Sequence, residues 1–176
     1  MGSFIFLTDW GWSALDYGDD WKLKRVFLPG PGPEGILKKL GSGCQEIGRS
    51  HTPTPAGELA ERVQAYYRGH IIRDWQVRLD LSGFTPFLHS IWRETSRIPY
   101  GETTSYGNIA RAINNPRACQ AVGQALSRNP WPLIIPCHRV LAAHGPGGFT
   151  GPGGVSTKKK MLDMEKESVK RVAGQA

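Results

Sequence analysis

The sequence predicts a mixed α/β protein in two parts: a small sheet-containing part over residues 1–80 and a largely helical part over residues 81–176. Short apolar runs with alternating spacing fill the start of the chain, as in half-buried strands. Helical spacing and helix-start signals dominate the second half. Hydrophobic residues make up 39% of the 176 residues, and six residues are tryptophan. This composition can bury a core and argues against disorder.

The first part begins with elements typical of an antiparallel sheet. Phe4–Leu7 predicts a short strand, Asp9–Trp12 a tight turn, and Ser13–Tyr17 the partner strand. Trp21–Leu28 alternates imperfectly and predicts a third, half-buried strand. We expect this strand to end at Pro29, because proline cannot donate a hydrogen bond to a neighbouring strand.

The rest of the first part combines loops with helices. Pro29–Pro33 predicts a loop, and Gly35–Leu40 predicts a short helix. Gly41–Pro55 is rich in Gly, Ser, Thr and Pro and predicts a mobile connection. Ala56–Tyr67 has helical spacing, and Trp75–Leu81 alternates as a further strand would. The buried face of the Ala56–Tyr67 helix is expected to carry Leu59, Val63 and Tyr66.

The second part opens on a helix-start signal. Thr85 is followed directly by Pro86, the order expected of an N-cap and a proline in the first turn. The Ile98-Pro99 pair is expected to end this helix, because proline disfavours helical backbone in the residue before it. The inward-pointing side chains are predicted to be Phe87, Ile91 and Trp92.

Two further helices are predicted across a tight turn. Thr104 or Ser105 is expected to cap a helix over 106–113, and Asn114–Pro116 makes the turn. A second helix is expected over 116–127 and is rich in small residues. This arrangement is typical of a helix-turn-helix unit, but an ordinary helical hairpin fits the pattern equally well.

The charge of the chain favours a polyanionic partner. The formal net charge is +7 and the pI is about 9.5, although a basic protein without such a partner would look the same. No apolar run approaches the roughly 18 residues needed to cross a bilayer, and the first residues lack a basic segment typical of a secretory signal. We therefore expect nucleic acid rather than membrane, and a location in the cytoplasm or the nucleus. Three widely spaced cysteines predict neither a disulfide framework nor a zinc site, which fits a reducing compartment.

The most informative segment is Leu133–Leu141, in which a cysteine, a histidine and an arginine follow one another. The apolar run before it is of strand type and would place Cys137 at the rim of a packed element. Only the thiolate is strongly nucleophilic, and nearby His or Arg lowers a thiol pKa. Cys137 is thus a candidate nucleophile, although a structural cysteine beside a surface histidine fits the triplet as well.

A glycine-rich segment follows the cysteine. It lacks the strand and helix context of a dinucleotide or phosphate loop. It could be a simple turn-rich loop, or a backbone wall that lets a flat ligand approach closely. Its glycines stand at positions 147, 148, 151, 153 and 154.

Taken together, these segments resemble the O6-alkylguanine-DNA alkyltransferases, the methylated-DNA–protein-cysteine methyltransferases. The resemblance is strong over residues 83–166 and weaker towards the start of the chain. It implies a small ribonuclease-H-like sheet domain followed by a winged-helix-like domain that binds DNA and carries out catalysis. The segments that carry the resemblance are Ile98–Ala110, Asn115–Pro130, Leu133–Leu141, Gly147–Gly154 and Met161–Glu165.

The resemblance implies suicidal DNA repair, in which Cys137 accepts the alkyl group of O6-alkylguanine. Whether O4-alkylthymine is also a substrate stays open. His138 would then contact the thiol through water, and Glu165 would orient the histidine. Tyr106 would donate a proton towards N3 of guanine, and Asn129 would hold the turn before the cysteine. From the residues alone, Glu165 could equally lie on a solvated helix face, Tyr106 in the core, and Asn129 in an ordinary turn.

The resemblance also implies how a base and its duplex would be held. The carbonyls of Cys137 and Val140 and the amide of Thr150 would bind guanine, with Phe149 as an aromatic wall in place of the more common tyrosine. Space near Pro132, Thr150 and Gly147 would set the preferred alkyl size. Minor-groove contacts would come from the second helix of the pair, through Arg117, Ala118, Gln120, Ala121, Gly123 and Arg128.

One expected DNA contact departs from the family pattern. Gln120 stands where the family has an arginine that fills the space left by the flipped base. Glutamine can hydrogen-bond the orphaned partner base but lacks the charge and the wide planar head of arginine. We therefore expect weaker or slower flipping, unless Arg117 compensates.

Other roles are expected to be few. Cys119 and Cys44 are predicted to be structural, and no cofactor or metal is expected. The expected partner is double-stranded DNA bearing O6-alkylguanine, bound by a monomer. Three alternatives remain: an alkyltransferase-like lesion binder with little transfer, a helix-turn-helix regulator with a sensor cysteine, and a thiol hydrolase. The last would need a histidine placed directly on the sulfur.

Overall fold

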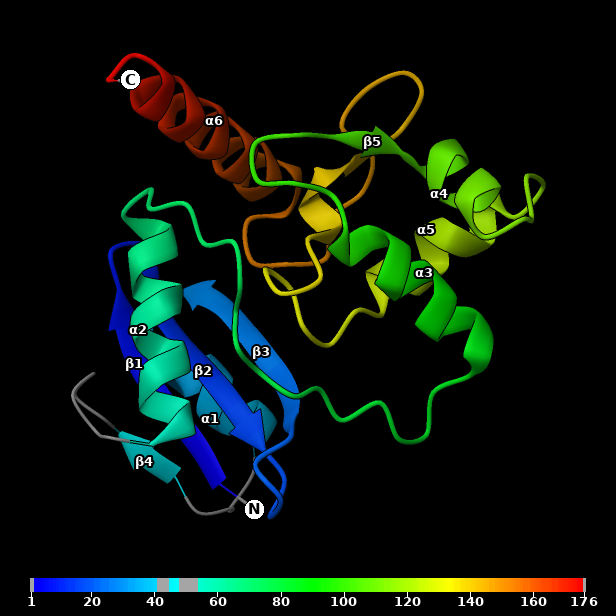
Figure 1. Cartoon of the computed structure of the whole chain (residues 1–176). Helices are drawn as coiled ribbons and strands as arrows, with labels where there is room; N and C mark the ends of the chain where they lie inside the picture. The colour runs from blue at the N-terminus through cyan, green and yellow to red at the C-terminus, as the bar shows by residue number, and fades with distance from the viewer. Residues whose placement is uncertain (1, 41–44, 48–53, 176) are drawn as a thin grey trace. The chain divides into compact units, whose positions relative to one another are not determined.

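The computed structural model describes residues 2–40, 45–47 and 54–175, and the predicted mixed α/β class is confirmed (Figure 1). The chain divides into two compact units, Met1–Leu81 and Ser82–Ala176. The sheet with its two helices belongs to the first unit, and the second unit is mostly helical.

The first unit is built on a four-stranded sheet with the order β3-β2-β1-β4. Strands β1 (Gly2–Thr8), β2 (Gly11–Tyr17) and β3 (Leu23–Gly30) form an antiparallel meander, and β4 (Gln45–Ile47) pairs in parallel with β1. The first hairpin and the third strand are therefore confirmed.

Two helices cover opposite faces of this sheet (Figure 1). Helix α1 (Glu34–Leu40) buries Ile36 in a cluster with strand residues that include Ile5 and Phe27. Helix α2 (Pro55–Tyr67) packs on β1 and β2. Its predicted inner face is confirmed, because the side chains of that face are buried: Leu59, Val63 and Tyr66.

Three expectations for the first unit need correction. Strand β3 continues through Pro29 to Gly30, which is possible because β3 lies at the sheet edge, where a missing donor costs little. The expected mobile connection contains β4, while 41–44, with Cys44, and 48–53 lie outside the described residues. Trp75–Leu81 is not a strand, because its bridge to the sheet joins only Leu79 to Leu23.

The second unit begins as predicted. Helix α3 (Pro86–Ser96) is capped by Thr85, whose Oγ1 accepts a hydrogen bond from the Leu88 amide at 3.4 Å. Ile91 and Trp92 are buried, but Phe87 is 39% exposed and was wrongly expected to point inward. Trp92 packs edge-on against Trp131, with ring centroids 5.3 Å apart, and this pair anchors the local core.

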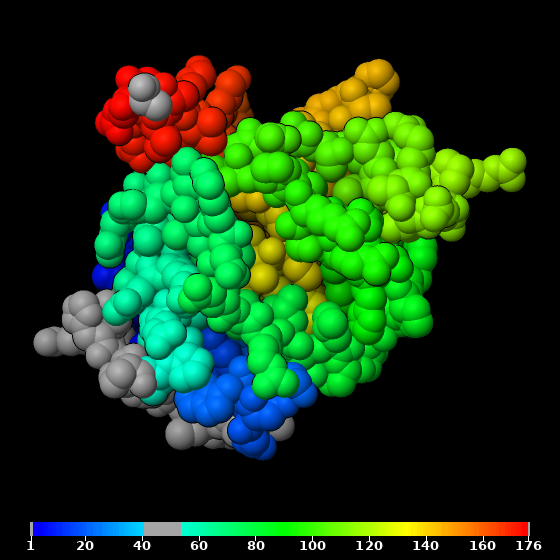
Figure 2. All heavy atoms as spheres, in the orientation of Figure 1, coloured from blue at the N-terminus to red at the C-terminus, as the bar shows by residue number. Residues whose placement is uncertain are grey.

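The predicted helix pair is present with a later second start. Helix α4 (Tyr106–Ala112) is capped by Ser105, whose Oγ accepts from the Asn108 amide at 3.1 Å. Helix α5 (Cys119–Ser127) packs on α4 and begins three residues after the predicted position, because 113–118 form an extended turn. This turn projects from the surface of the second unit (Figure 2).

The remaining elements surround the cysteine segment. A 3-10 helix, η1 (Cys137–Arg139), leads directly into strand β6 (Val140–Leu141). Strand β6 pairs in parallel with β5 (Thr104–Ser105), which places the start of α4 beside the cysteine segment. Helix α6 (Gly154–Ala173) completes the unit and contacts η1.

Candidate active site

Cys137 is positioned by a turn and not by the strand that its apolar neighbours suggested. Residues 131–136 form turns, and the Ile135 amide donates to the Trp131 carbonyl at 2.9 Å. Pro132 and Pro136 flank the run and lack the amide donors that a strand would need. Cys137 therefore opens η1, and its half-exposed side chain points into a pocket.

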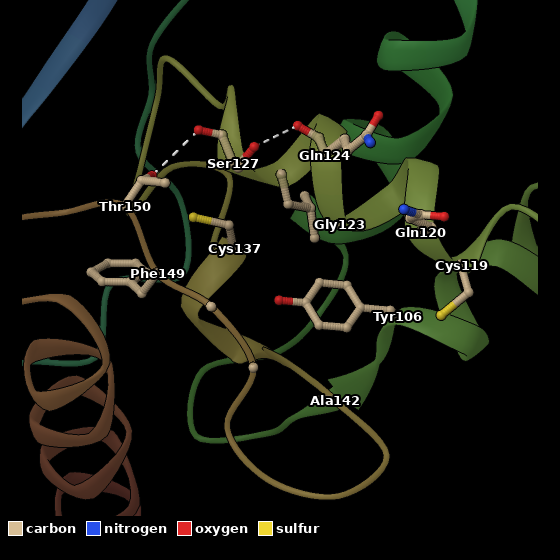
Figure 3. Close-up of a pocket in the computed structure, with 13 residues that line it drawn as sticks. Tyr106, Cys119, Gln120, Gly123, Gln124, Ser127, Cys137, Ala142, Phe149 and Thr150 are labelled. Atoms are coloured by element: carbon tan, nitrogen blue, oxygen red, sulfur yellow. Dashed lines mark hydrogen bonds between the residues drawn. The ribbon is translucent and has the colours of Figure 1, made fainter.

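The pocket has a volume of about 550 Å³ and lies between α5 and the loop 142–150. Figure 3 shows Cys137 on one wall, with Phe149 beside it on the loop. The phenol of Tyr106 points into the same space from the start of α4. The Thr150 hydroxyl donates to the Ser127 carbonyl at 3.3 Å and so ties the loop to the end of α5.

The turn of η1 sends His138 away from the pocket into a buried charged network. Its Nε2 lies 2.8 Å from Oε1 of Glu165, and both side chains are fully buried. Arg139 donates from Nε and Nη2 to the same carboxylate, each at 2.9 Å. The Gly101 amide adds a further hydrogen bond at 3.0 Å. Glu165 is therefore a buried anchor, and the possibility of a solvated helix face is wrong.

The network fixes the charges of its members. Burial acts to raise the pKa of Glu165, but the hydrogen bonds from His138 and Arg139 outweigh it and lower the pKa to about 2. Burial lowers the pKa of His138, against the opposing effect of Glu165. The pair at neutral pH is thus a carboxylate and a neutral imidazole. Because Nε2–H donates to Glu165, the basic lone pair of the ring lies on Nδ1.

Arg139 was noted in the sequence only as a basic neighbour. Its two bonds to Glu165, a third from Nη1 to the Ile98 carbonyl at 2.8 Å, and its place over the Tyr100 ring make it the main counter-charge of the network. In the sequence, only its position two residues after the cysteine pointed to a role in the site.

The thiol of Cys137 rests in a mixed environment. Burial raises its pKa, while a hydrogen bond with Asn129 and the charge of Lys158 act in the opposite direction. Asn129 also spans the turn before the cysteine, donating to the Ile135 carbonyl at 2.8 Å and accepting from the Trp131 amide at 3.0 Å. Asn129 is therefore more than an ordinary turn residue, because it contacts both the turn and the thiol.

Lys158 was missed by sequence reasoning. It is fully buried on α6, and its ammonium donates to the Val140 carbonyl at 2.7 Å and the Gly148 carbonyl at 3.3 Å. Lys158 opens a run of three lysines at 158–160. Helical spacing could have indicated its burial, because position 158 falls on the same helix face as the buried Met161 and Glu165.

The loop 142–150, which contains Gly147 and Gly148 and is called the glycine loop here, packs directly against Tyr106. A Cβ placed on Gly147 would lie 2.9 Å from both Cε2 and the hydroxyl of Tyr106, and Gly147 has φ +72°. Gly147 and Gly148 of this loop line the pocket, and the approach of a flat ligand to their backbone stays a prediction. Tyr106 is half-buried and lines the pocket, so it is not a core aromatic. Burial raises the pKa of its phenol.

Not every predicted substrate contact reaches the pocket. Among the described residues that line it, Phe149 and Thr150 are present but Pro132 and Val140 are not. Val140 is fully buried, and its carbonyl already accepts the hydrogen bond from Lys158.

The expected DNA-contacting residues gather on and around α5. Gln120 and Gly123 line the pocket, together with Gln124, which sequence reasoning did not single out. Cys119, expected to be structural, is exposed and also lines the pocket, on the far side of Tyr106 from Cys137 (Figure 3). The remaining residues flank or complete the helix: Arg117 and Arg128 are exposed, and Ala118 and Ala121 are half-buried.

The residues that the structure describes contain neither a metal-binding cluster nor a membrane-spanning helix. Within 2–40, 45–47 and 54–175, no three His, Cys, Asp or Glu side chains come together as a metal site would require. None of the helices in those ranges has the length and apolarity needed to cross a membrane.

Comparison with known proteins gives consistent matches. Residues 86–167 match the family model described as 6-O-methylguanine DNA methyltransferase, DNA binding domain. A Mycobacterium leprae methylated-DNA–protein-cysteine methyltransferase is 39% identical over 151 residues, which cover 78% of this chain and 90% of the relative. The constitutive Bacillus subtilis protein of the same name is 39% identical over 123 residues, covering 68% and 72%.

Solved structures agree over nearly the whole chain. The crystal structure of Mycobacterium tuberculosis OGT in complex with DNA has a TM-score of 0.77 and 30% sequence identity, covering 96% of this chain and 94% of that one. The crystal structure of the Mycobacterium tuberculosis O6-methylguanine methyltransferase gives 0.75 and 30%, covering 95% and 93%.

Proposed function

The chain belongs to the methylated-DNA–protein-cysteine methyltransferase family, and from this membership we infer that it repairs DNA by taking the alkyl group of O6-alkylguanine onto Cys137. The observation that carries the assignment is the thiol of Cys137 at the wall of a pocket, one residue before the buried His138–Glu165 pair. A flat base fits between α5 and the glycine loop, where backbone can approach it closely.

We propose the following proton movements. Neutral His138 takes the thiol proton through a water molecule, and Glu165 stabilises the imidazolium that forms. The Cys137 thiolate attacks the alkyl carbon, so that the S–C bond forms as the C–O6 bond breaks. Tyr106 gives a proton to N3 of the departing guanine and recovers one from the imidazolium through water. In sum, the sulfur gains one alkyl group and loses one proton. The guanine loses the alkyl group and gains one proton.

The reaction ends with the protein consumed. A thioether is not cleaved by water under mild conditions, and the proposed steps contain no group that would remove it. Each molecule therefore repairs one lesion, which distinguishes this thiol from that of a hydrolase, where a thioester intermediate is released by water.

Access to the thiol requires the base to leave the helix. A stacked base cannot reach a thiol inside a pocket, so the nucleotide must be flipped out, at a cost of a few kcal/mol. We propose that α5 enters the minor groove, where its small residues permit close approach. Arg117 and Arg128, exposed at either end of this helix, would contact phosphates, and Gln120 would occupy the vacated space.

The test is the intact mass of the protein after incubation with a duplex oligonucleotide bearing one O6-methylguanine. We expect the mass of the protein to rise by one methylene group, and the rise to be absent in Cys137→Ala. Binding of the duplex without any mass gain would contradict alkyl transfer and favour a lesion-binding protein. A gain that persists in Cys137→Ala would contradict the assignment of the acceptor.

A further inference from the structure

Lys158 is a buried cation that the proposed chemistry does not yet use. Lysine is rarely fully buried without a partner, because removing an ammonium from water is costly. Lys158 is 0% exposed, and its ammonium donates to two neutral carbonyls. A leucine or methionine would fill such a site without this cost. The retained charge therefore calls for a functional explanation.

The two carbonyls place Lys158 between the segment that carries Cys137 and the glycine loop. Val140 follows η1 and so belongs to the segment that carries Cys137, and Gly148 belongs to the glycine loop opposite. The ammonium also lies 5.9 Å from the centroid of the Tyr106 ring. One side chain thus joins the cysteine segment to the loop and faces the proposed proton donor.

The electrostatic coupling between Lys158 and Cys137 is mutual. Burial raises the pKa of the thiol and lowers the pKa of the lysine, and the coupling opposes both shifts. The lysine charge acts to lower the pKa of the thiol, and a thiolate acts to raise the pKa of the lysine. In the resting thiol state, the partners of the ammonium among the described residues are two carbonyl dipoles. When the thiol loses its proton, a negative charge forms in the field of a cation that is already in place and needs no reorganisation.

We propose that Lys158 is a positioning residue whose charge stabilises the Cys137 thiolate while its hydrogen bonds hold the glycine loop against the cysteine segment. This role rests on the proposed alkyl transfer. His138 receives the proton, and Lys158 stabilises the anion left behind. The two groups act from different elements, η1 and α6.

The test measures thiolate formation without any alkylguanine. The rate of carboxamidomethylation of Cys137 by iodoacetamide is followed against pH by peptide mass, which separates Cys137 from Cys44 and Cys119. Lys158→Met removes the charge at similar length, Lys158→Gln removes it but keeps donors, and Lys158→Arg keeps it. Lys159→Met, on the exposed neighbour, is the matched control.

We expect the midpoint of the pH profile to rise by about one unit in both neutral variants, which makes reaction at pH 7 about tenfold slower. Lys158→Arg and Lys159→Met are expected to keep the midpoint of the unmodified chain. If Lys158→Met does not fold, Lys158→Gln decides. An unchanged midpoint in a folded neutral variant would overturn the proposal. Since iodoacetamide is not an alkylguanine, such a result would leave the proposed repair activity standing.

Discussion

At the scale of single residues, the site depends on the hydrogen bonds that hold the Glu165 carboxylate. His138, Arg139 and the Gly101 amide all donate to it, and it has no exposed surface. Removing one partner of a buried ion pair leaves the other charge uncompensated, which costs about 3–5 kcal/mol. Glu165 therefore links the stability of the second unit to the orientation of His138.

We expect Glu165→Gln to lower the free energy of unfolding by about 3–5 kcal/mol. We also expect it to slow the reaction with O6-benzylguanine, a free base that can donate its alkyl group without base flipping. Urea unfolding and intact-mass kinetics measure the two effects, with Glu167→Gln, exposed on the same helix, as control.

The folded-state pKa of Glu165, about 2, lies below its ordinary 4.5, so the carboxylate stabilises the fold above pH 4.5. This contribution is lost as the pH falls towards 2, and the loss should be absent in the variant. Equal acid sensitivity of both chains would contradict this account.

The shape of the pocket is expected to be sensitive to any side chain added at Gly147. Alanine at φ +72° costs about 1–2 kcal/mol, and its Cβ would press on the Tyr106 ring and hydroxyl. We expect Gly147→Ala to slow the reaction with O6-benzylguanine at least tenfold. Gly148→Ala is the control, because a Cβ there meets nothing within 4 Å and Gly148 has no positive φ. Equal slowing in both variants would show that the loop tolerates no side chain at all, whatever its contact with Tyr106.

At the scale of elements, the proposed contact of α5 with DNA depends on where charge lies along this helix. No residue of α5 is charged, and Gln120 and Gln124 stand one turn apart along the pocket. Exposed arginines flank the helix at Arg117 and Arg128. The helix can thus approach a groove with its neutral residues. The arginines at its two ends would contact phosphates, and neutral side chains would contact the flipped base.

We expect Gln120→Arg to speed repair of O6-methylguanine in duplex DNA while leaving the reaction with free O6-benzylguanine unchanged, because only the duplex requires flipping. Rapid-quench kinetics on both substrates provide the measurement. Gln124→Arg adds the same charge one turn away and controls for general attraction to DNA. Identical duplex rates for Gln120→Arg and the unmodified chain would rule out a flipping deficit.

The elements also show what the sequence can and cannot reveal. The helix starts at Thr85 and Ser105 were predictable because a cap is a local interaction between neighbours. Strand β4 was missed because its parallel pairing with β1 joins residues more than forty positions apart. The apolar run before Cys137 was misread as a strand, since short apolar runs do not reveal their own geometry. The burial of Lys158 depends on tertiary packing and was likewise missed.

At the scale of the whole molecule, the parts divide between scaffold and site. Every residue that lines the pocket lies in the unit Ser82–Ala176, as do the His138–Glu165 network and Lys158. The net charge of +7 favours association with DNA. The conspicuous features of the unit Met1–Leu81 are a sheet and a packed core, and none of its described residues lines this pocket.

The central claim is that this chain is a single-use acceptor. The most direct test is the number of guanines restored when a duplex bearing O6-methylguanine is present in large excess over protein. We expect restoration to stop at one guanine per protein molecule, with the methyl group found on Cys137 by fragment mass. Continued restoration beyond one equivalent would contradict suicidal transfer, and a plateau with the methyl group on another residue would contradict the site.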